Sequence, residues 1–508
     1  MAKLKDYNGH FCESDFEYAF IGFLEKEGWN YLVGNKINRV TKNDVLIADD
    51  FKIFISKTNK DLIDDEVTQI FDNVRLVGAE SDFATLHKVY GWMVDGVQFT
   101  PQNGLARMVN LIDFENPDNN IFRVVNQFTV EYINNGQKEI RRPDVLLFVN
   151  GMPLCVIELK NPGDTHATVF DAWEQINIRY WRDIPHLLHY CPLACISDGV
   201  KTRLGTVRTP YEHFYAWRRV NDGDGVSTLP FAETETMIKG VYSPARFLEL
   251  FRDYIYFQDT IYDHEEVEIV CRYPQFFASK LLKQSIVNSI VDGTGKGGTY
   301  FGATGCGKTY TMAFLTRQLA LRCTDIPAIG SPTIILIVDR EELQKQGAKL
   351  FTKSKEFLNL GEVSVVKNRK QLREELGARQ SGGFYICTIQ KFCDREDDKI
   401  GLINDRKNII CFSDEAHRTQ LEHSKKIQFS KDADENMKAM VSKPYAKVLK
   451  EAFPQATFVG FTGTPIAETY QTFGEEIDRY TMDQAVADGL TVPIKYHPRI
   501  AKVLLDKE

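Results

Sequence analysis

The stretch Gly302-Ala303-Thr304-Gly305-Cys306-Gly307-Lys308-Thr309 decides how the second half of the chain is organised. It follows a short apolar strand predicted over Thr299-Phe301 and opens a helix predicted from Tyr310 to Arg322. Glycines at these places let backbone N–H groups wrap phosphates, and a helix N-terminus favours their negative charge. Lys308 reaches the outer phosphates and Thr309 offers its hydroxyl to Mg²⁺. The sequence therefore predicts an ATP and Mg²⁺ site formed by Gly302, Thr304, Gly305, Cys306, Gly307, Lys308 and Thr309.

Short apolar segments alternate with helical segments from residue 299 onward. The predicted strands are Thr299-Phe301, Thr333-Val338, Tyr385-Thr388, Ile409-Ser413 and Thr457-Thr462. Regular alternation of this kind predicts a parallel sheet that helices cover on both faces. The fold class of this half is therefore α/β.

The acidic box Asp414-Glu415-Ala416-His417 directly follows the strand Ile409-Ser413. Its carboxylates emerge at the carboxyl edge of the sheet, where open α/β sheets bind their ligands. Asp414 is predicted to hold Mg²⁺, and Glu415 is predicted to orient and deprotonate the attacking water. A charged helix start is the alternative, and the phosphate-binding loop upstream makes it the weaker one.

A second group of acidic residues lies upstream, on a hairpin predicted through Asn150-Gly151. The two strands are Val145-Val149 and Leu154-Leu159. Asp144 precedes the first strand, and Glu158 and Lys160 lie at the end of the second. In the functional interpretation, Asp144 and Glu158 coordinate Mg²⁺ beside a scissile phosphate, and Lys160 activates the water or stabilises the transition state. The alternative is an exposed hairpin with charged ends.

Strand parity decides between these interpretations. A regular two-residue turn at Asn150-Gly151 puts Asp144 and Glu158 on opposite faces of the sheet. A three-residue loop, Val149 to Gly151, makes Glu158 the diagonal neighbour of Asp144 on one face, and Lys160 follows on that face. We therefore predict an odd-length loop or a bulge in this hairpin.

The bulk properties exclude some classes of protein. The 508 residues, 43% hydrophobic and 26% charged, are typical of a globular protein with several domains. The net charge of −8 argues against indiscriminate nucleic-acid binding, although a local basic track remains compatible with it. The apolar runs are strand-sized, so no membrane span or secretory signal is predicted. The scattered cysteines within apolar runs indicate reduced thiols and a cytoplasmic location.

The expected domains are 1–255, a compact mixed α/β domain, and 256–492, the parallel-sheet domain. A helix is predicted over Ser14 to Lys26, a strand over Val124-Val130 and another over Leu193-Ile196, with a second helix across Thr168-Trp181. Residues 493–508 are too few for another domain, so we expect a truncated protein.

The second half resembles the first RecA-like domain of superfamily 2 helicases and translocases. Besides the loop and the acidic box, the resemblance rests on Val338-Asp339-Arg340-Glu341-Glu342-Leu343-Gln344-Lys345-Gln346, Thr388-Ile389-Gln390, Phe461-Thr462-Gly463-Thr464-Pro465 and Arg272-Tyr273-Pro274-Gln275. It implies DNA contacts through Arg340, Thr388 and Gln390, and adenine recognition by Arg272 and Gln275. The second RecA-like domain, which brings an arginine finger, would begin at 493–508, so we expect this chain to bind ATP but hydrolyse it poorly.

The first half is similar to PD-(D/E)xK nucleases through Arg142-Pro143-Asp144 and Glu158-Leu159-Lys160. Glu17 on the first helix matches the acidic residue that such domains often add. Gln175, in Asp171-Ala172-Trp173-Glu174-Gln175, is expected at the nuclease site. The R subunits of type I restriction enzymes, which this segment also resembles, usually have a Tyr four residues after this Gln. Here Arg179 occupies that position and Tyr180 follows, so Tyr180 reaches the site only if the helix bulges.

Nearly the whole chain resembles the R subunit of type I restriction enzymes. The resemblance rests on residues 141–151, 156–162 and 171–175, on Ile196-Ser197-Asp198-Gly199, and on all the motifs of the second half. This resemblance implies ATP-driven translocation on double-stranded DNA and Mg²⁺-dependent endonucleolytic cleavage, carried out with a methylation (M) and a specificity (S) subunit. Two alternatives stay open: a freestanding helicase–nuclease of DNA repair, and a translocase or remodeller that does not cut and whose acidic hairpin is structural.

Overall fold

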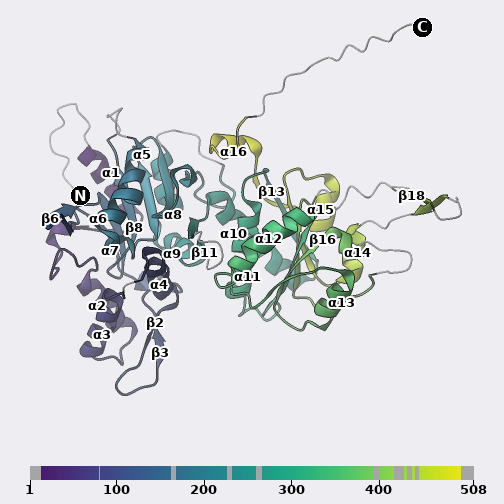
Figure 1. The fold of residues 1–508 in the computed structure, drawn as a ribbon, viewed down its shortest axis with the longest axis horizontal. Coiled ribbons are helices and arrows are strands. Elements are labelled where there is room, and N and C mark those ends of the chain that lie inside the picture. The colour runs from purple at the N-terminus through teal and green to yellow at the C-terminus, as the bar shows by residue number, and fades with distance from the viewer. Residues whose placement is uncertain are drawn as a thin grey trace, which may run out of the picture.

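The computed structural model describes residues 13–78, 80–161, 168–225, 232–258, 266–392, 400–416, 428–431, 437–440 and 445–493. Within these ranges, residues up to 270 form an N-terminal part and residues from 271 onward form a C-terminal part, each built around one large sheet (Figure 1). His417 of the acidic box and residues 494–508 lie outside the described residues.

The N-terminal part is built on a mixed six-stranded sheet in the order β1-β4-β7-β8-β9-β10. Its helices and 3-10 or π turns are α1 (Glu13–Lys26), η1 (Gly34–Lys36), α2 (Ala48–Thr58), α3 (Asp64–Arg75), α4 (Asp82–Asp95), η2 (Pro117–Asn119), α5 (Val169–Glu174), η3 (Gln175–Tyr180), α6 (Trp181–Asp183), α7 (Pro185–Leu188), η4 (Tyr211–His213), α8 (Glu233–Val241) and α9 (Pro244–Asp253). Its strands are β1 (Asn30–Val33), β2 (Val97–Phe99), β3 (Arg107–Val109), β4 (Phe122–Asn126), β5 (Val130–Asn134), β6 (Gln137–Arg141), β7 (Val145–Val149), β8 (Met152–Leu159), β9 (Leu193–Ser197), β10 (Thr202–Thr206), β11 (Ile255–Gln258) and β12 (Val267–Val270).

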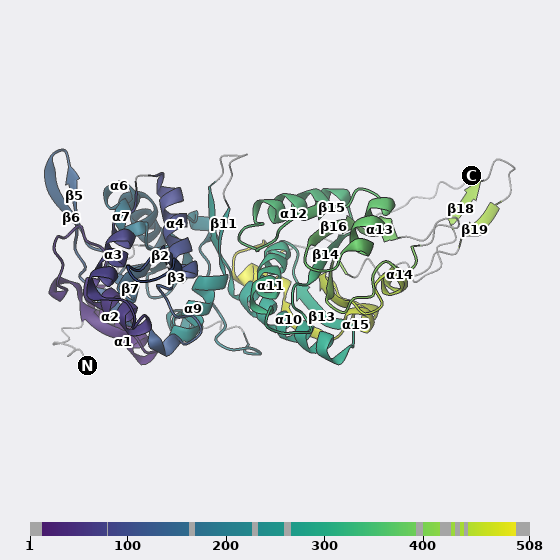
Figure 2. The same ribbon diagram turned by 90° about the horizontal axis from the view of Figure 1, so that it is seen from below.

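The centre of this sheet is apolar on both faces. Every residue of β7 and β8 is buried, which explains their continuous runs of hydrophobic residues. The predicted strand Val124-Val130 is in fact two strands, because Gln127 has a φ of 55° and breaks the extended backbone between β4 and β5. The β5–β6 ribbon stands out from the body (Figure 2).

The C-terminal part confirms the predicted α/β fold. All neighbours in its seven-stranded sheet, ordered β15-β16-β14-β17-β20-β13-β21, run parallel. Its strands are β13 (Lys296–Gly302), β14 (Thr333–Val338), β15 (Val363–Val365), β16 (Phe384–Thr388), β17 (Ile409–Asp414), β18 (Gln428–Lys431), β19 (Met437–Met440), β20 (Thr457–Thr462) and β21 (Glu476–Tyr480). Its helices are α10 (Tyr273–Asp292), α11 (Lys308–Arg322), α12 (Glu341–Lys353), α13 (Arg369–Ala378), η6 (Ile389–Phe392), α14 (Tyr445–Ala452), α15 (Ala467–Phe473) and α16 (Met482–Ala487).

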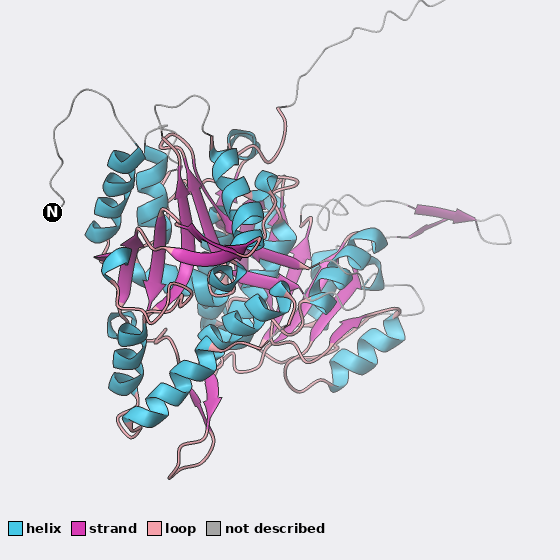
Figure 3. Ribbon diagram, turned by 60° about the vertical axis from the view of Figure 1, so that its left-hand side comes forward, coloured by secondary structure: helices cyan, strands magenta, loops and turns pink. Residues whose placement is uncertain are grey.

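Successive residues of the central strand β14 pack into different cores. Ile334 and Leu336 belong to the larger core, which continues into the N-terminal part, whereas Ile335 and Ile337 belong to a separate core on the other face. Because strand side chains alternate between faces, both faces of this sheet are buried. Helices lie on both sides of the strands in Figure 3. No helix among the described residues is long and apolar enough to cross a membrane.

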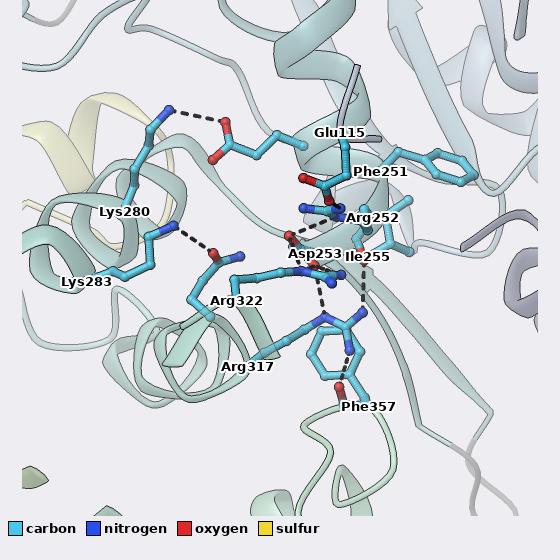
Figure 4. A network of polar contacts seen from close by, with 12 residues as sticks. Glu115, Phe251, Arg252, Asp253, Ile255, Lys280, Lys283, Arg317, Arg322 and Phe357 are labelled. Carbon is cyan, nitrogen blue, oxygen red and sulfur yellow. Dashed lines mark hydrogen bonds and ion pairs between the residues drawn. The ribbon is translucent and has the colours of Figure 1, made fainter. Parts of the chain in front are cut away.

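Buried ion pairs join the two parts. Asp253, at the end of α9, is 1% exposed, and its Oδ1 lies 2.7 Å from Arg322 Nη2 and 3.5 Å from Arg317 Nε of α11 (Figure 4). Burial alone would raise the pKa of Asp253, but the arginines outweigh it and lower the pKa. Arg219 makes a second buried pair with Asp478 of β21 at 2.8 Å. The helix that follows the phosphate-binding loop is therefore anchored on the N-terminal part.

Candidate functional sites

The hairpin contains a bulge. Its turn has two residues, Asn150 and Gly151, with φ values of 49° and 77°. The pairing shifts between Leu147↔Cys155 and Phe148↔Pro153, so β8 holds one extra residue. Continuing the register from Val145↔Ile157 sets Asp144 opposite Glu158.

The predicted odd-length loop or bulge is thus confirmed as a bulge, whereas the three-residue loop, Val149 to Gly151, is wrong. The left-handed backbone of Asn150 is stabilised because both the nitrogen and the oxygen of its side-chain amide form hydrogen bonds. Asn150 Nδ2 donates to Leu111 O at 2.9 Å, and its Oδ1 accepts from Ile121 N at 2.8 Å. The extra residue is Leu154, which has no partner on β7, and it follows Pro153, which has no N–H to give to the sheet.

Asp144 and Glu158 form a close acidic pair. Leu159 N donates to Asp144 Oδ2 at 2.8 Å, and Asp144 N donates to Glu158 Oε1 at 3.4 Å. Burial and the neighbouring Asp144 raise the pKa of Glu158 well above its usual range, and burial raises the pKa of Asp144. Two such carboxyl groups can both be ionised only when a cation compensates their charge; otherwise they share a proton.

Gln175 links this acidic pair to Lys160. Lys160 Nζ donates to Gln175 Oε1 at 2.9 Å, and Gln175 Nε2 donates to Glu158 Oε2 at 2.7 Å. The backbone N–H of Lys160 is held by Ser197 O of β9 at 2.8 Å. The four residues predicted for the acidic site, Asp144, Glu158, Lys160 and Gln175, therefore meet at one place.

The helix after the hairpin does bulge. Residues Gln175–Tyr180 form the π-helical segment η3, which inserts one residue into the helical repeat. Tyr180 Oη consequently reaches Glu158 Oε1 at 2.6 Å, and Gln175 Nε2 donates to Tyr180 Oη at 2.8 Å. Arg179, at the ordinary spacing, points away and pairs with Glu174 at 3.0 Å. The single helix predicted across Thr168-Trp181 is thus α5, η3 and the start of α6.

Glu17 also lies at this site. It is 7% exposed, and its Oε1 accepts from Asn126 Nδ2 at 2.6 Å. Burial raises its pKa, and the charge of Asp144 adds to the rise. Asn126, at the end of β4, carries no sequence signal of its own, because only tertiary structure brings it to α1.

The donor set at the acidic site suits Mg²⁺. Among the described residues no group of three or more His, Cys, Asp and Glu side chains could hold a metal. Mg²⁺, however, is commonly bound through one or two carboxylates and keeps several waters. Asp144 and Glu158 offer two carboxylates and no nitrogen or sulfur, so the residues fit Mg²⁺ and not a structural zinc.

The phosphate-binding loop has the expected conformation. It runs from the end of β13 into α11, and Gly305 and Gly307 have φ values of 82° and 84°. Lys308 Nζ donates to Gly302 O at 3.2 Å and lies 3.6 Å from Glu415 Oε1. The loop lysine and the acidic box, distant in sequence, therefore face each other across the carboxyl edge of the sheet. Thr304 and Gly305 are exposed, Cys306 is buried, and Thr309 is half-buried.

The acidic box ends β17 with a sharp turn at Glu415, whose φ is 48°. Glu415 N donates to Asp414 Oδ1 at 3.0 Å. Burial raises the pKa of Asp414 to about 6, although the charge of Lys308 opposes the rise. A carboxylate so placed gains from a cation, as Mg²⁺ with a nucleotide would provide.

Gln275 and Arg272 lie beside the loop. Gln275 Oε1 accepts from Arg272 N at 2.9 Å, and its Nε2 donates to Gly307 O at 3.4 Å. Gln275 is only 3% exposed, and these two hydrogen bonds connect the start of α10 to the loop.

The predicted DNA contacts divide into two kinds. Arg340 follows β14 and Gln390 follows the neighbouring strand β16, and both are exposed. Gln390 Nε2 donates to Asp339 O at 2.9 Å, which holds the two loops together. Thr388 is only 4% exposed, and its hydroxyl accepts from Lys391 Nζ at 3.2 Å, so it is far less accessible than Arg340 and Gln390.

Comparison with known proteins fits this arrangement. Residues 11–213 match the N terminus of the type I restriction enzyme R protein. The N-terminal part of the chain belongs to this family. Residues 274–508 match the SWI2/SNF2 ATPase. The endonuclease subunit of the type I restriction enzyme HindI from Haemophilus influenzae is 31% identical over 506 residues, which cover 95% of this chain and 46% of that protein.

Other relatives agree with the assignment. A Methanocaldococcus jannaschii protein described as a type I restriction enzyme endonuclease subunit is 28% identical, over 97% of this chain and 46% of that protein. The chain thus spans about half the length of the curated relatives it matches. A solved fragment of an HsdR subunit from Vibrio vulnificus is 16% identical, with a TM-score of 0.26 over 72% of this chain and 56% of that one.

Proposed function

We propose that this chain carries the nuclease and the nucleotide-binding part of the motor of a type I restriction enzyme. The whole protein would translocate double-stranded DNA at the expense of ATP and cut phosphodiester bonds of foreign DNA in a Mg²⁺-dependent step. The observation that supports cutting most directly is the meeting of Asp144, Glu158, Lys160 and Gln175, which needs both a strand bulge and a helix packed beside it.

At the nuclease site, Asp144 and Glu158 would hold Mg²⁺, and Lys160 would stabilise negative charge on the scissile phosphate. Bound there, Mg²⁺ would supply a Lewis acid that activates water. Gln175 keeps Lys160 and Glu158 in fixed positions through its two hydrogen bonds, and Tyr180 fixes the second oxygen of Glu158. Glu17 adds a third carboxyl group near Asp144.

At the nucleotide site, the loop from Gly302 to Thr309 would cradle the phosphates of ATP. Thr309 and Asp414 would hold the Mg²⁺ that accompanies it, and Lys308 would contact the outer phosphates. Glu415, 3.6 Å from Lys308, would orient the attacking water. Arg272 and Gln275 would recognise the adenine, and the exposed Arg340 and Gln390 would contact the DNA backbone.

The proposed domains are 1–255 for the nuclease, 256–492 for the first RecA-like domain and 493–508 for the start of a second. We propose methylation and specificity subunits as partners. We also propose the cytoplasm as the location, supported by the eight cysteines within the described residues, which are all buried free thiols.

Point variants of the intact protein test the two sites separately. Glu158→Ala and Lys160→Ala should abolish DNA cleavage and spare ATP hydrolysis, whereas Lys308→Ala should abolish ATP turnover. The matched controls are Glu174→Ala, at the end of α5 and paired with Arg179, and Lys296→Ala, at the exposed start of β13. Unchanged cleavage in both nuclease-site variants would favour a translocase that does not cut.

Dependence of cleavage on partner subunits distinguishes the restriction function from a freestanding helicase–nuclease. Cleavage that requires the methylation and specificity subunits and an unmethylated target site supports the restriction function. Cleavage by the isolated intact protein at any DNA end would instead indicate a freestanding helicase–nuclease of DNA repair.

A further inference from the structure

A short segment connects the N-terminal sheet to the nucleotide site. Tyr215 is bonded to Leu204 of β10 in both directions: Leu204 N donates to Tyr215 O at 2.9 Å, and Tyr215 N donates to Leu204 O at 3.1 Å. Two residues on, the buried Trp217 packs its ring against Phe276 of α10, with ring centroids 5.6 Å apart. The backbone of Tyr215 is therefore fixed by the N-terminal part, although the segment lies against the C-terminal part.

The side chain of Tyr215 contacts a residue of the nucleotide site. The guanidinium carbon of Arg272 lies 4.1 Å from the centroid of the Tyr215 ring. Stacking on an aromatic face suits the planar, weakly hydrated guanidinium and restricts where its donors point. Arg272 is thus held at two ends, by Gln275 at its backbone N–H and by Tyr215 at its guanidinium.

One nitrogen of this guanidinium has no hydrogen-bond acceptor among the described residues. This nitrogen, Arg272 Nη1, is buried. A buried donor without a partner is destabilising, so an acceptor supplied by a ligand would be favourable. Arg272 lies close to the loop, since Gln275 bonds both to the backbone N–H of Arg272 and to Gly307 O.

We propose that Tyr215 is a positioning residue for nucleotide binding. It holds Arg272 so that the unpaired Nη1 meets an acceptor on the base of a nucleoside triphosphate whose phosphates occupy the loop. The base is the favoured partner because Lys308 and the helix N-terminus already serve the phosphates. The nucleotide site would then be completed by the N-terminal part of the chain. This inference rests on the proposed ATP site.

Direct binding measurements test it without requiring turnover. Calorimetry on the full chain would compare ATP with inorganic tripolyphosphate, which has no base, at constant Mg²⁺. Tyr215→Leu should weaken ATP binding roughly tenfold, the equivalent of one desolvated stacking contact, and leave tripolyphosphate binding unchanged. Tyr215→Phe, which keeps the ring and loses only the hydroxyl beside His213 Nδ1 at 3.0 Å, should bind ATP within about twofold of the parent.

A double-mutant cycle provides the second measurement. Arg272→Met should reproduce the loss seen in Tyr215→Leu, and the combined variant should lose no more than either alone, because Tyr215 acts through Arg272. Additive losses, an equal loss of ATP and tripolyphosphate, or ATP binding by Tyr215→Leu equal to the parent would each overturn the proposal. Lys308→Ala, which removes a phosphate contact, should weaken binding of both ATP and tripolyphosphate, and it therefore tests the proposed ATP site separately from the role of Tyr215. A parent chain that binds neither ligand would refute the ATP site itself.

Discussion

Tyr180 Oη lies 2.6 Å from Glu158 Oε1, and it reaches this carboxylate across five residues from Gln175 because the helix widens into a π turn there. Gln175 and Tyr180 then hold Glu158 from its two oxygens. One inserted residue thus changes which side chain faces the acidic site and leaves the site complete.

Removing the inserted residue should be tolerated. Deletion of the exposed Arg179 should convert η3 into regular α-helix, place Tyr180 four residues after Gln175, and keep the following residues in register. We expect a melting temperature and a Mg²⁺-dependent cleavage rate near those of the parent. Deletion of the exposed Gln284 from the regular helix α10 is the control, because it turns all later residues by about 100°. A ΔArg179 protein as damaged as ΔGln284 would show that the π turn is not a simple insertion.

The hydroxyl of Tyr180 should matter for cleavage and not for the motor. Tyr180→Phe removes the hydrogen bond to Glu158 and leaves the buried ring in place. We expect cleavage to slow roughly tenfold, since one hydrogen bond to a charged group is worth about 1.5–3 kcal/mol in favourable cases. ATP hydrolysis by the intact protein should be unaffected. Equal loss of both activities in single-turnover assays would contradict this role.

Asp253 should be a major contributor to stability. Asp253→Asn leaves Arg317 and Arg322 in a buried place without their counter-charge. We expect the free energy of unfolding in urea to fall by about 3–5 kcal/mol, as is typical when one partner of a buried ion pair is removed.

Glu249→Gln offers a matched comparison to Asp253→Asn. It breaks the half-exposed pair with Lys280, at 3.1 Å, which also joins α9 to the C-terminal part. Solvent screens that pair, so its loss should cost less than about 1 kcal/mol. Similar losses in the two variants would show that burial of Asp253 is not the decisive factor.

Glu268 should make stability depend on pH. It is 4% exposed on β12, and burial raises its pKa well above the usual range. The folded state therefore keeps a proton that the unfolded chain releases above its ordinary pKa of about 4.3. Since the folded state binds more protons in this window, stability must fall as pH rises, by at most about 1.4 kcal/mol per pH unit.

Glu268→Gln removes this titration and keeps the shape of the side chain. The variant should gain stability over the parent as the pH rises from 5 to 8, measured as the difference in urea unfolding. A difference that stays constant across that range would mean that Glu268 is ionised in the folded protein.

Both halves of the fold, and the places of most candidate site residues, were predictable from the sequence. The loop from Gly302 to Thr309 and the acidic box have fixed local spacing, and each needs only a preceding strand to be placed. The alternation of strands and helices then requires a parallel sheet, whose carboxyl edge collects both motifs. The burial of Thr388 was not predictable in this way. It is 4% exposed at the end of β16 and accepts a hydrogen bond from Lys391, and the motif specifies neither feature.

The sequence by itself picked out the candidate residues of both sites, since short motifs encode residue type and spacing. Tertiary structure alone decided which of them meet. The position of the extra residue at Leu154, rather than in the turn, sets Asp144 opposite Glu158. The π turn that brings in Tyr180, the contact of Asn126 with Glu17 and the stacking of Arg272 on Tyr215 likewise join residues far apart in the chain. Such contacts depend on side-chain packing and register, and local sequence patterns do not fix either.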